Sequence, residues 1–89
     1  SDFQQANKPA NFLAKRFAAK EATAKALGTG FRNGLSLTHI EVTNNDQGKP
    51  ELHFYHRGLE LLAELNISRC FVSLSDEQDY AMAYVILEE

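Results

Sequence analysis

The chain has 89 residues, 44% of them hydrophobic, with nine Lys and Arg against twelve Asp and Glu and a formal net charge of −3. This length predicts one small domain, residues 1–89, whose surface is large relative to its core, so marginal stability or oligomerisation is expected. The acidic balance argues against general nucleic-acid binding, and the lack of an apolar run of about eighteen residues predicts that no helix spans a membrane.

The first predicted element is an amphipathic helix that begins near residues 8–9 and ends near residues 27–28. Pro9 suits the first turn of a helix, and Gly28 suits a left-handed cap at its end. The helical period predicts that one apolar face packs on a core, with these members: Leu13, Ala14, Phe17, Ala18, Ala24 and Leu27.

The same helix carries one carboxylate among four basic residues. Arg16 and Lys20 lie four positions apart, as do Glu21 and Lys25, so each pair shares one side of the helix. The run closes on residues 28–30, Gly-Thr-Gly, whose amide groups could approach a phosphate. The pattern suits a divalent cation that holds a phosphorylated ligand. The alternatives are a solvated helix face with an ordinary Glu-to-Lys pair, and a simple helix cap at Gly28.

The remainder predicts alternating strands and one helix, which gives an α+β fold. Residues 35–42 and 51–55 are expected to form a hairpin around a turn at residues 44–50. A second helix is predicted over residues 58–66, with Leu59, Leu62 and Ala63 facing inward. Strands over residues 69–75 and 80–88 follow, joined by an acidic turn at residues 76–79.

The last predicted strand is apolar on both faces. Such a strand is either central in a sheet or covered by another subunit. The single cysteine, Cys70, excludes an intramolecular disulfide and fits a reducing, cytoplasmic location, where it is expected to be a small core residue.

Three stretches of the chain resemble the holo-acyl-carrier-protein synthases, which are 4'-phosphopantetheinyl transferases. The first is Phe12-Leu-Ala-Lys-Arg-Phe-Ala-Ala-Lys-Glu-Ala-Thr-Ala-Lys-Ala-Leu-Gly-Thr-Gly30, followed by Phe31-Arg-Asn-Gly-Leu35. The resemblance continues through Glu41-Val-Thr-Asn-Asn-Asp-Gln-Gly-Lys-Pro50 and ends in residues 72–87. It therefore covers nearly the whole chain from Asn11 onward.

The resemblance implies an enzyme of fatty acid biosynthesis that transfers 4'-phosphopantetheine from coenzyme A to a serine of acyl carrier protein. It also implies a homotrimer with active sites between neighbouring subunits. Glu21 would be a ligand to Mg²⁺, which suits one or two carboxylates plus substrate phosphates. Lys25 would approach the reacting phosphates, and Arg16 would bind the 3'-phosphate of the nucleotide.

Further contacts with coenzyme A are implied on the glycine turn, the hairpin and a later strand. The expected residues are Gly28, Gly30, Lys49, Pro50 and Ser73. Many members of the family have a histidine where this chain has Asp76, so the histidine's phosphate contact is not carried over, and Asp76 is expected only to shape the turn.

A further departure is that the family's Gly-x-Gly-x-Asp strand and basic helix do not occur in these 89 residues. We therefore expect a fragment that corresponds to the larger C-terminal part of the enzyme. The alternative function is a non-catalytic, oligomeric coenzyme A-binding domain, or an inactive truncated form. His39, His53 and His56 follow no closed zinc pattern and are expected to be structural or exposed.

Overall fold

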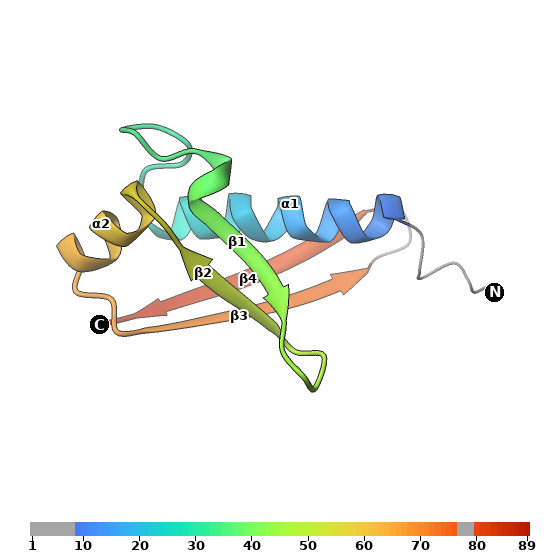
Figure 1. Ribbon diagram of the computed structural model, residues 1–89. Helices are drawn as coiled ribbons and strands as arrows, with labels where there is room; N and C mark the ends of the chain where they lie inside the picture. Colours follow the sequence, from blue (N-terminus) through green and yellow to red (C-terminus); the bar gives the residue numbers. More distant parts are fainter. Residues whose placement is uncertain (1–8, 77–79) are drawn as a thin grey trace.

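The computed structural model describes residues 9–76 and 80–89. A long helix, α1, and a short helix, α2, combine with two antiparallel hairpins (Figure 1). The elements are α1 (Pro9–Ala26), the 3₁₀ turn η1 (Leu37–His39), β1 (Ile40–Asn44), β2 (Pro50–Phe54), α2 (Arg57–Glu64), β3 (Arg69–Asp76) and β4 (Ala81–Glu88). The predicted α+β class is confirmed.

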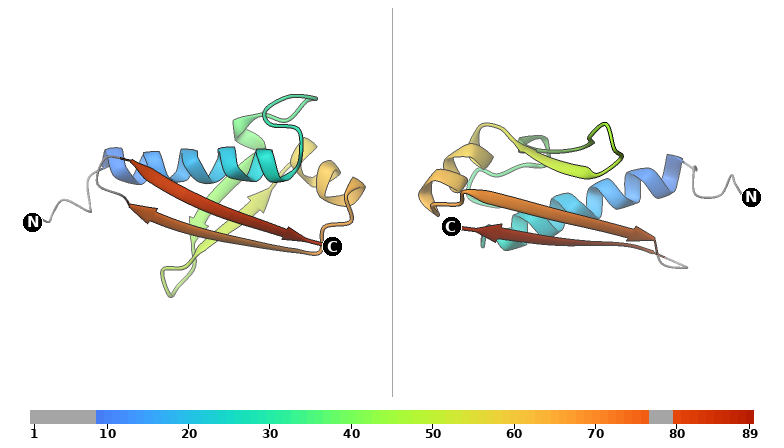
Figure 2. Two further views of the ribbon diagram at one scale, coloured as in Figure 1. Left: turned by 180° about the vertical axis from the view of Figure 1, so that it is seen from behind. Right: turned by 90° about the horizontal axis from the view of Figure 1, so that it is seen from below.

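The β3–β4 hairpin runs along α1, and the β1–β2 hairpin crosses over the same helix (Figure 2). The core lies toward the C-terminal end of α1, where the helix meets β1 and α2. It consists of Ala24, Leu27, Leu35, Ile40 and Leu61, with Leu52, Phe54, Leu62 and Leu87 packed around it. Within the described part of the chain, neither helix is long and apolar enough to cross a membrane.

The predicted apolar face of α1 is right at its C-terminal half and wrong at its N-terminal half. Ala24 and Leu27 are buried, but Leu13 and Phe17 are 63% and 49% exposed, and Ala14 is exposed too. The buried side passes instead through Ala19 and Thr23. Thr23 can enter the core because its hydroxyl donates to the carbonyl of Ala19 at 2.7 Å, which satisfies a polar group that sequence periodicity places outside.

The predicted strand over residues 35–42 is also corrected. Leu35 is buried in the core, η1 follows, and β1 begins only at Ile40. The reason is local hydrogen bonding. The Ser36 amide donates to Nδ1 of His39 at 3.3 Å, and the His39 amide donates to the Ser36 carbonyl at 3.0 Å. These bonds favour a tight turn over an extended chain.

Helix α2 is rotated relative to the sequence prediction. Gly58 and Leu61 are buried and Leu62 is half-buried, whereas Leu59 is 55% exposed and Ala63 is exposed. Gly58 sets this rotation, because a Cβ at that position would lie 2.8 Å from the carbonyl oxygen of His39. The helix docks on the backbone through its glycine, and Leu61, one turn later, enters the core.

We expect Gly58→Ala to destabilise the fold, because the added methyl group meets a backbone oxygen that cannot move freely. Overpacking of this kind costs about 1–3 kcal/mol in the free energy of unfolding. Urea denaturation followed by circular dichroism measures it. Ala63→Ser on the exposed side of α2 is the control, and equal stability of the Gly58→Ala and parent proteins would contradict the docking argument.

Strand β4 pairs with β3 alone among the described residues. Of the two predicted alternatives, a central strand or one covered by another subunit, the central position is therefore not the one adopted within this subunit. One face of this hairpin carries large exposed apolar side chains: Phe71, Tyr80, Tyr84 and Ile86. Tyr84 and Ile86 are 61% and 58% exposed. Of the predicted acidic turn, Asp76 ends β3, and residues 77–79 lie outside the described residues.

Candidate functional site

A shallow depression of about 160 Å³ lies beside the C-terminal end of α1. Its lining residues are Glu21, Ala24, Lys25, Gly30 and Phe31. Glu21 and Lys25 are both exposed on successive turns of the helix. The depression therefore brings together three of the residues singled out in the sequence, one acidic, one basic and one glycine.

The glycine turn beside this depression closes the helix. The Gly28 amide donates to the Lys25 carbonyl at 2.9 Å, and the Gly30 amide donates to the Ala24 carbonyl at 3.0 Å. Gly28 adopts φ +88°, which glycine allows without strain. The expectation that these two amides face a phosphate is corrected, because both satisfy carbonyl groups at the helix end. Gly30 still lines the depression, and Gly28 is exposed beside it.

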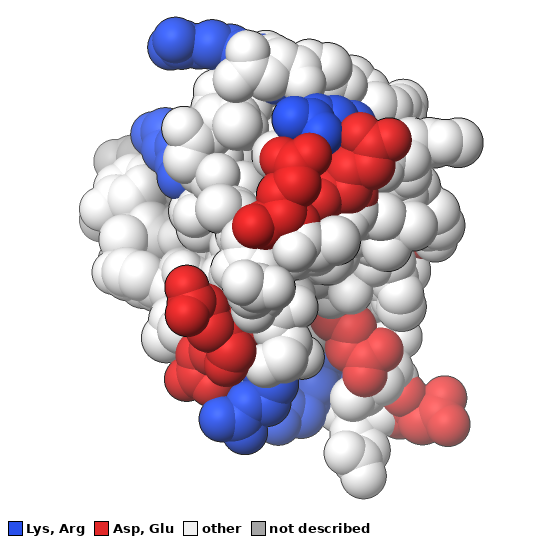
Figure 3. Space-filling model, turned by 90° about the vertical axis from the view of Figure 1, so that its left-hand side faces the viewer, with Lys and Arg blue, Asp and Glu red and all other residues white. Residues whose placement is uncertain are grey.

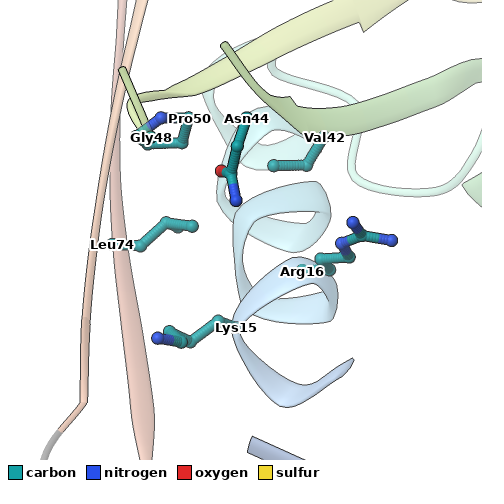
Figure 4. A pocket seen from close by; sticks show the side chains of 7 residues that line it. All are labelled: Lys15, Arg16, Val42, Asn44, Gly48, Pro50 and Leu74. Atoms are coloured by element: carbon teal, nitrogen blue, oxygen red, sulfur yellow. The ribbon is translucent and has the colours of Figure 1, made fainter. Parts of the chain in front are cut away.

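A second pocket, of about 200 Å³, lies between the N-terminal half of α1 and the two hairpins (Figure 4). Lys15 and Arg16 line it from the helix, and Pro50 lines it from β2. The remaining lining residues are Val42, Asn44, Gly48 and Leu74. Arg16 also borders a neighbouring groove of about 440 Å³ that contains Leu13, Phe17, Lys20, Leu37, Glu41 and Val42.

The turn between β1 and β2 is held in one shape by Asn45. Its side-chain oxygen accepts hydrogen bonds from the amides of Gln47 at 2.8 Å and Lys49 at 2.9 Å. This side-chain mimic of a turn is typical of Asn, and Gly48 follows at φ +82°. The turn places Gly48 and Pro50 at the Arg16 pocket. Lys49 lies in a separate pocket of about 400 Å³ between β2 and β3, which Pro50 also borders.

Sequence reasoning missed Lys15, which pairs with Asp76. The Lys15 ammonium lies 3.1 Å from a carboxylate oxygen of Asp76, and both side chains are partly exposed. Asp76 therefore does more than shape a turn, because it offsets one of the two positive charges at the pocket. No local signal links residues 61 positions apart; only the packing of α1 on β3 joins them.

Ser73 is exposed on β3 and is not among the residues that line the three pockets near it, although its neighbours Val72 and Leu74 are. The prediction that Ser73 contacts coenzyme A stays a prediction, and it would require the ligand to reach the exposed face of the hairpin. Strand alternation explains the difference, because successive side chains point to opposite faces of the hairpin.

Within the described ranges, no group of three or more His, Cys, Asp and Glu side chains could hold a metal ion. Glu21 contributes a single carboxylate in the depression, which fits Mg²⁺ only when phosphate oxygens and water complete the coordination. His39 and His56 face each other with ring centroids 5.4 Å apart, and His53 hydrogen-bonds Thr43 at 2.8 Å. These contacts fit the structural role predicted for the histidines.

Cys70 is half-buried in β3, and burial raises the pKa of its thiol. A raised pKa leaves less thiolate at neutral pH, so the sulfur is a poor nucleophile. The prediction that Cys70 is a small core residue is met only in part, because its side chain is half-buried and does not belong to the core cluster.

Three comparisons with known proteins agree. The family model of the 4'-phosphopantetheinyl transferase superfamily matches residues 1–85. The holo-[acyl-carrier-protein] synthase of Hamiltonella defensa is 51% identical over 88 residues, covering 99% of this chain and 70% of that protein. The synthase of Alteromonas mediterranea is 59% identical over 81 residues, covering 91% of this chain and 64% of that protein.

Solved structures give the same result. The crystal structure of the synthase from Neisseria meningitidis superposes with a TM-score of 0.85 at 48% identity, covering 99% of this chain and 70% of that one. The Helicobacter pylori synthase in complex with coenzyme A superposes with a TM-score of 0.79 at 26% identity, covering 93% of this chain and 70% of that one. The chain thus spans about two thirds of the length of these relatives.

Proposed function

The chain belongs to the 4'-phosphopantetheinyl transferase superfamily, among the holo-[acyl-carrier-protein] synthases, and from this premise we propose that it transfers 4'-phosphopantetheine from coenzyme A to acyl carrier protein. The observation that carries the proposal is identity of 51–59% to synthases over nearly the whole chain. The domain spans residues 1–89 and acts in the cytoplasm in fatty acid biosynthesis.

In the proposed reaction, the serine oxygen of the carrier protein forms a bond to the phosphorus next to the pantetheine arm. The bond from that phosphorus to the bridging oxygen breaks, the serine loses its proton, and 3',5'-adenosine bisphosphate leaves. Negative charge grows on the departing phosphate. Groups that stabilise this charge therefore account for most of the rate.

Glu21 and Lys25 are the residues we assign to this step. Glu21 would hold Mg²⁺ together with phosphate oxygens, and the ion supplies positive charge to the developing anion. Lys25 shares the depression with Glu21 and would bring an ammonium group to the same phosphates. Gly30 leaves that side of the depression open, since nothing lies within 4 Å of a Cβ built on it.

The nucleotide end of coenzyme A is assigned to the Arg16 pocket. The planar guanidinium of Arg16 suits a phosphate, and the pocket offers apolar surface from Val42, Pro50 and Leu74. Lys49 would approach from the adjoining pocket that Pro50 also borders. Lys15 is paired with Asp76. Arg16 is the anion ligand we assign here, because its planar guanidinium can bind two phosphate oxygens at once.

A homotrimer with active sites between subunits would bring the Glu21–Lys25 depression of one subunit next to the Arg16 pocket of another. Arg16 and Glu21 are five positions apart on α1, so they leave the helix on different sides, and they line different pockets. One subunit's Glu21 depression could meet a neighbour's Arg16 pocket. The exposed apolar side chains of α1 and of the β3–β4 hairpin support such an association.

The oligomeric state gives the test of this arrangement. We expect light scattering after size-exclusion chromatography to give three times the chain mass, and Tyr84→Asp to shift it to one chain mass, because an exposed apolar face then carries a charge. Thr38→Asp, on an exposed turn, is the control. A parent protein that elutes as a monomer would contradict the trimer.

The transfer itself is tested by incubating apo-acyl carrier protein with the chain, coenzyme A and Mg²⁺, and by measuring intact carrier mass. Addition of the phosphopantetheine mass is the expected result, and chelation of Mg²⁺ should abolish it. Calorimetric binding of coenzyme A without any mass increase would instead favour a non-catalytic coenzyme A-binding domain.

A further inference from the structure

The segment that connects α1 to η1 forms one wall of the Glu21 depression. Gly30 and Phe31 line the depression, and the segment then runs through Asn33 and Gly34 to the buried Leu35. Asn33 and Gly34 both adopt left-handed backbone angles, with φ +56° and φ +89°. Residues 31–34 are exposed, so core packing does not by itself fix this wall.

Arg57, in the first turn of α2, contacts the exposed part of this segment. Its Nε donates to the carbonyl oxygen of Asn33 at 2.9 Å, across 24 positions of sequence. Its aliphatic carbons also lie 3.5 and 3.6 Å from the position a Cβ would take on Gly34, so the arginine packs in van der Waals contact beside this glycine. One side chain therefore holds two consecutive left-handed residues.

Arg57 is itself held by two carboxylates of α2. Its Nη1 donates to Glu64 at 2.9 Å and to Glu60 at 3.0 Å. Acidic and basic side chains lie against one another at the end of the molecule where α2 lies (Figure 3). The hydrogen bonds to Glu64 and then Glu60 raise the pKa of Arg57. The carboxylates preset the orientation in which Nε reaches Asn33.

We propose that Arg57 is a positioning residue for the Glu21–Lys25 depression: by holding the Asn33 carbonyl, it fixes the wall that Gly30 and Phe31 form. This inference rests on the proposed transferase function. A simple surface ion pair, with a stabilising effect of about 0–1 kcal/mol, is the competing interpretation. The two interpretations differ in what loss of Arg57 should do. Only the positioning role predicts faster amide exchange at residues 31–35 and slower turnover.

The first measurement needs no activity. Amide hydrogen exchange of the parent chain and of Arg57→Ala is compared by mass spectrometry, and residues 31–35 are expected to exchange about tenfold faster in the variant. Arg69→Ala is the matched control, because Arg69 forms its ion pair with Glu88 within the β3–β4 hairpin. Unchanged exchange in Arg57→Ala would overturn the proposal.

The second measurement is kinetic. Arg57→Ala is expected to lower kcat for transfer by about tenfold, with KM for coenzyme A nearly unchanged, because the displaced wall borders the reacting phosphates and not the Arg16 pocket. Faster exchange with an unchanged kcat would overturn the link to the depression. If the parent chain transfers nothing, the exchange measurement alone decides whether Arg57 holds residues 31–35. Failure of this inference can therefore be told apart from failure of the proposed transferase function.

A third variant separates positioning from ion pairing. The double change Glu60→Gln and Glu64→Gln removes both charges but leaves the bond from Arg57 to Asn33 available. We expect its exchange and kcat to lie closer to the parent than to Arg57→Ala. An effect as large as that of Arg57→Ala would overturn the assignment of the Asn33 contact as what holds the segment, because that contact is available in both the parent and the double variant.

Discussion

Replacing Glu21 by Gln is expected to reduce the rate of carrier protein modification by about a thousandfold, because metal stabilisation of transition-state charge contributes several kcal/mol. The substitution keeps the size of the side chain and removes only its charge. Glu21 is exposed in the depression, so the fold should be unaffected. Initial rates from intact mass, measured over a range of Mg²⁺ concentrations, check this prediction.

Glu89→Gln is the control for that experiment, since Glu89 is an exposed carboxylate at the end of the described chain. It should leave both the rate and the Mg²⁺ dependence as in the parent. A Glu21→Gln variant that retains the parent's rate at every Mg²⁺ concentration would exclude Glu21 as the metal ligand. The assignment of the reacting phosphates to the Glu21–Lys25 depression would then have to be abandoned.

Replacing Arg16 by Ala is expected to raise KM for coenzyme A by about tenfold to a hundredfold, because a hydrogen bond to a charged group contributes about 1.5–3 kcal/mol. The change in kcat should be small, since Arg16 lies in the pocket assigned to the nucleotide and not beside Glu21 and Lys25. Steady-state kinetics with varied coenzyme A measure both parameters.

Dephospho-coenzyme A, which lacks the 3'-phosphate, makes the Arg16 test specific. The parent should discriminate against it, and Arg16→Ala should bind both compounds about equally. Arg69→Ala again serves as the control because its partner, Glu88, lies away from the pocket. If Arg16→Ala still prefers coenzyme A by the parent's ratio, another residue binds the 3'-phosphate.

Local signals were sufficient for several features of this chain. Among the described residues α1 runs over Pro9–Ala26, as predicted for this segment, and its final turn is closed by Gly28 as predicted. Glu21 and Lys25 fall in one depression because helical spacing requires them to share a side. The hairpin around residues 44–50 follows from turn chemistry that lies within the segment itself.

The sequence by itself determined most of the elements, the position of Glu21 and Lys25 on one side of α1, and the family, because these depend on neighbours within a few residues or on motif order. Only the tertiary structure decided which side of α1 is buried and that Gly58 rotates α2. It also joined Lys15 to Asp76 and Arg57 to Asn33. These contacts link residues distant in sequence or depend on the exact approach of two backbones. Residue types and their local spacing predict neither.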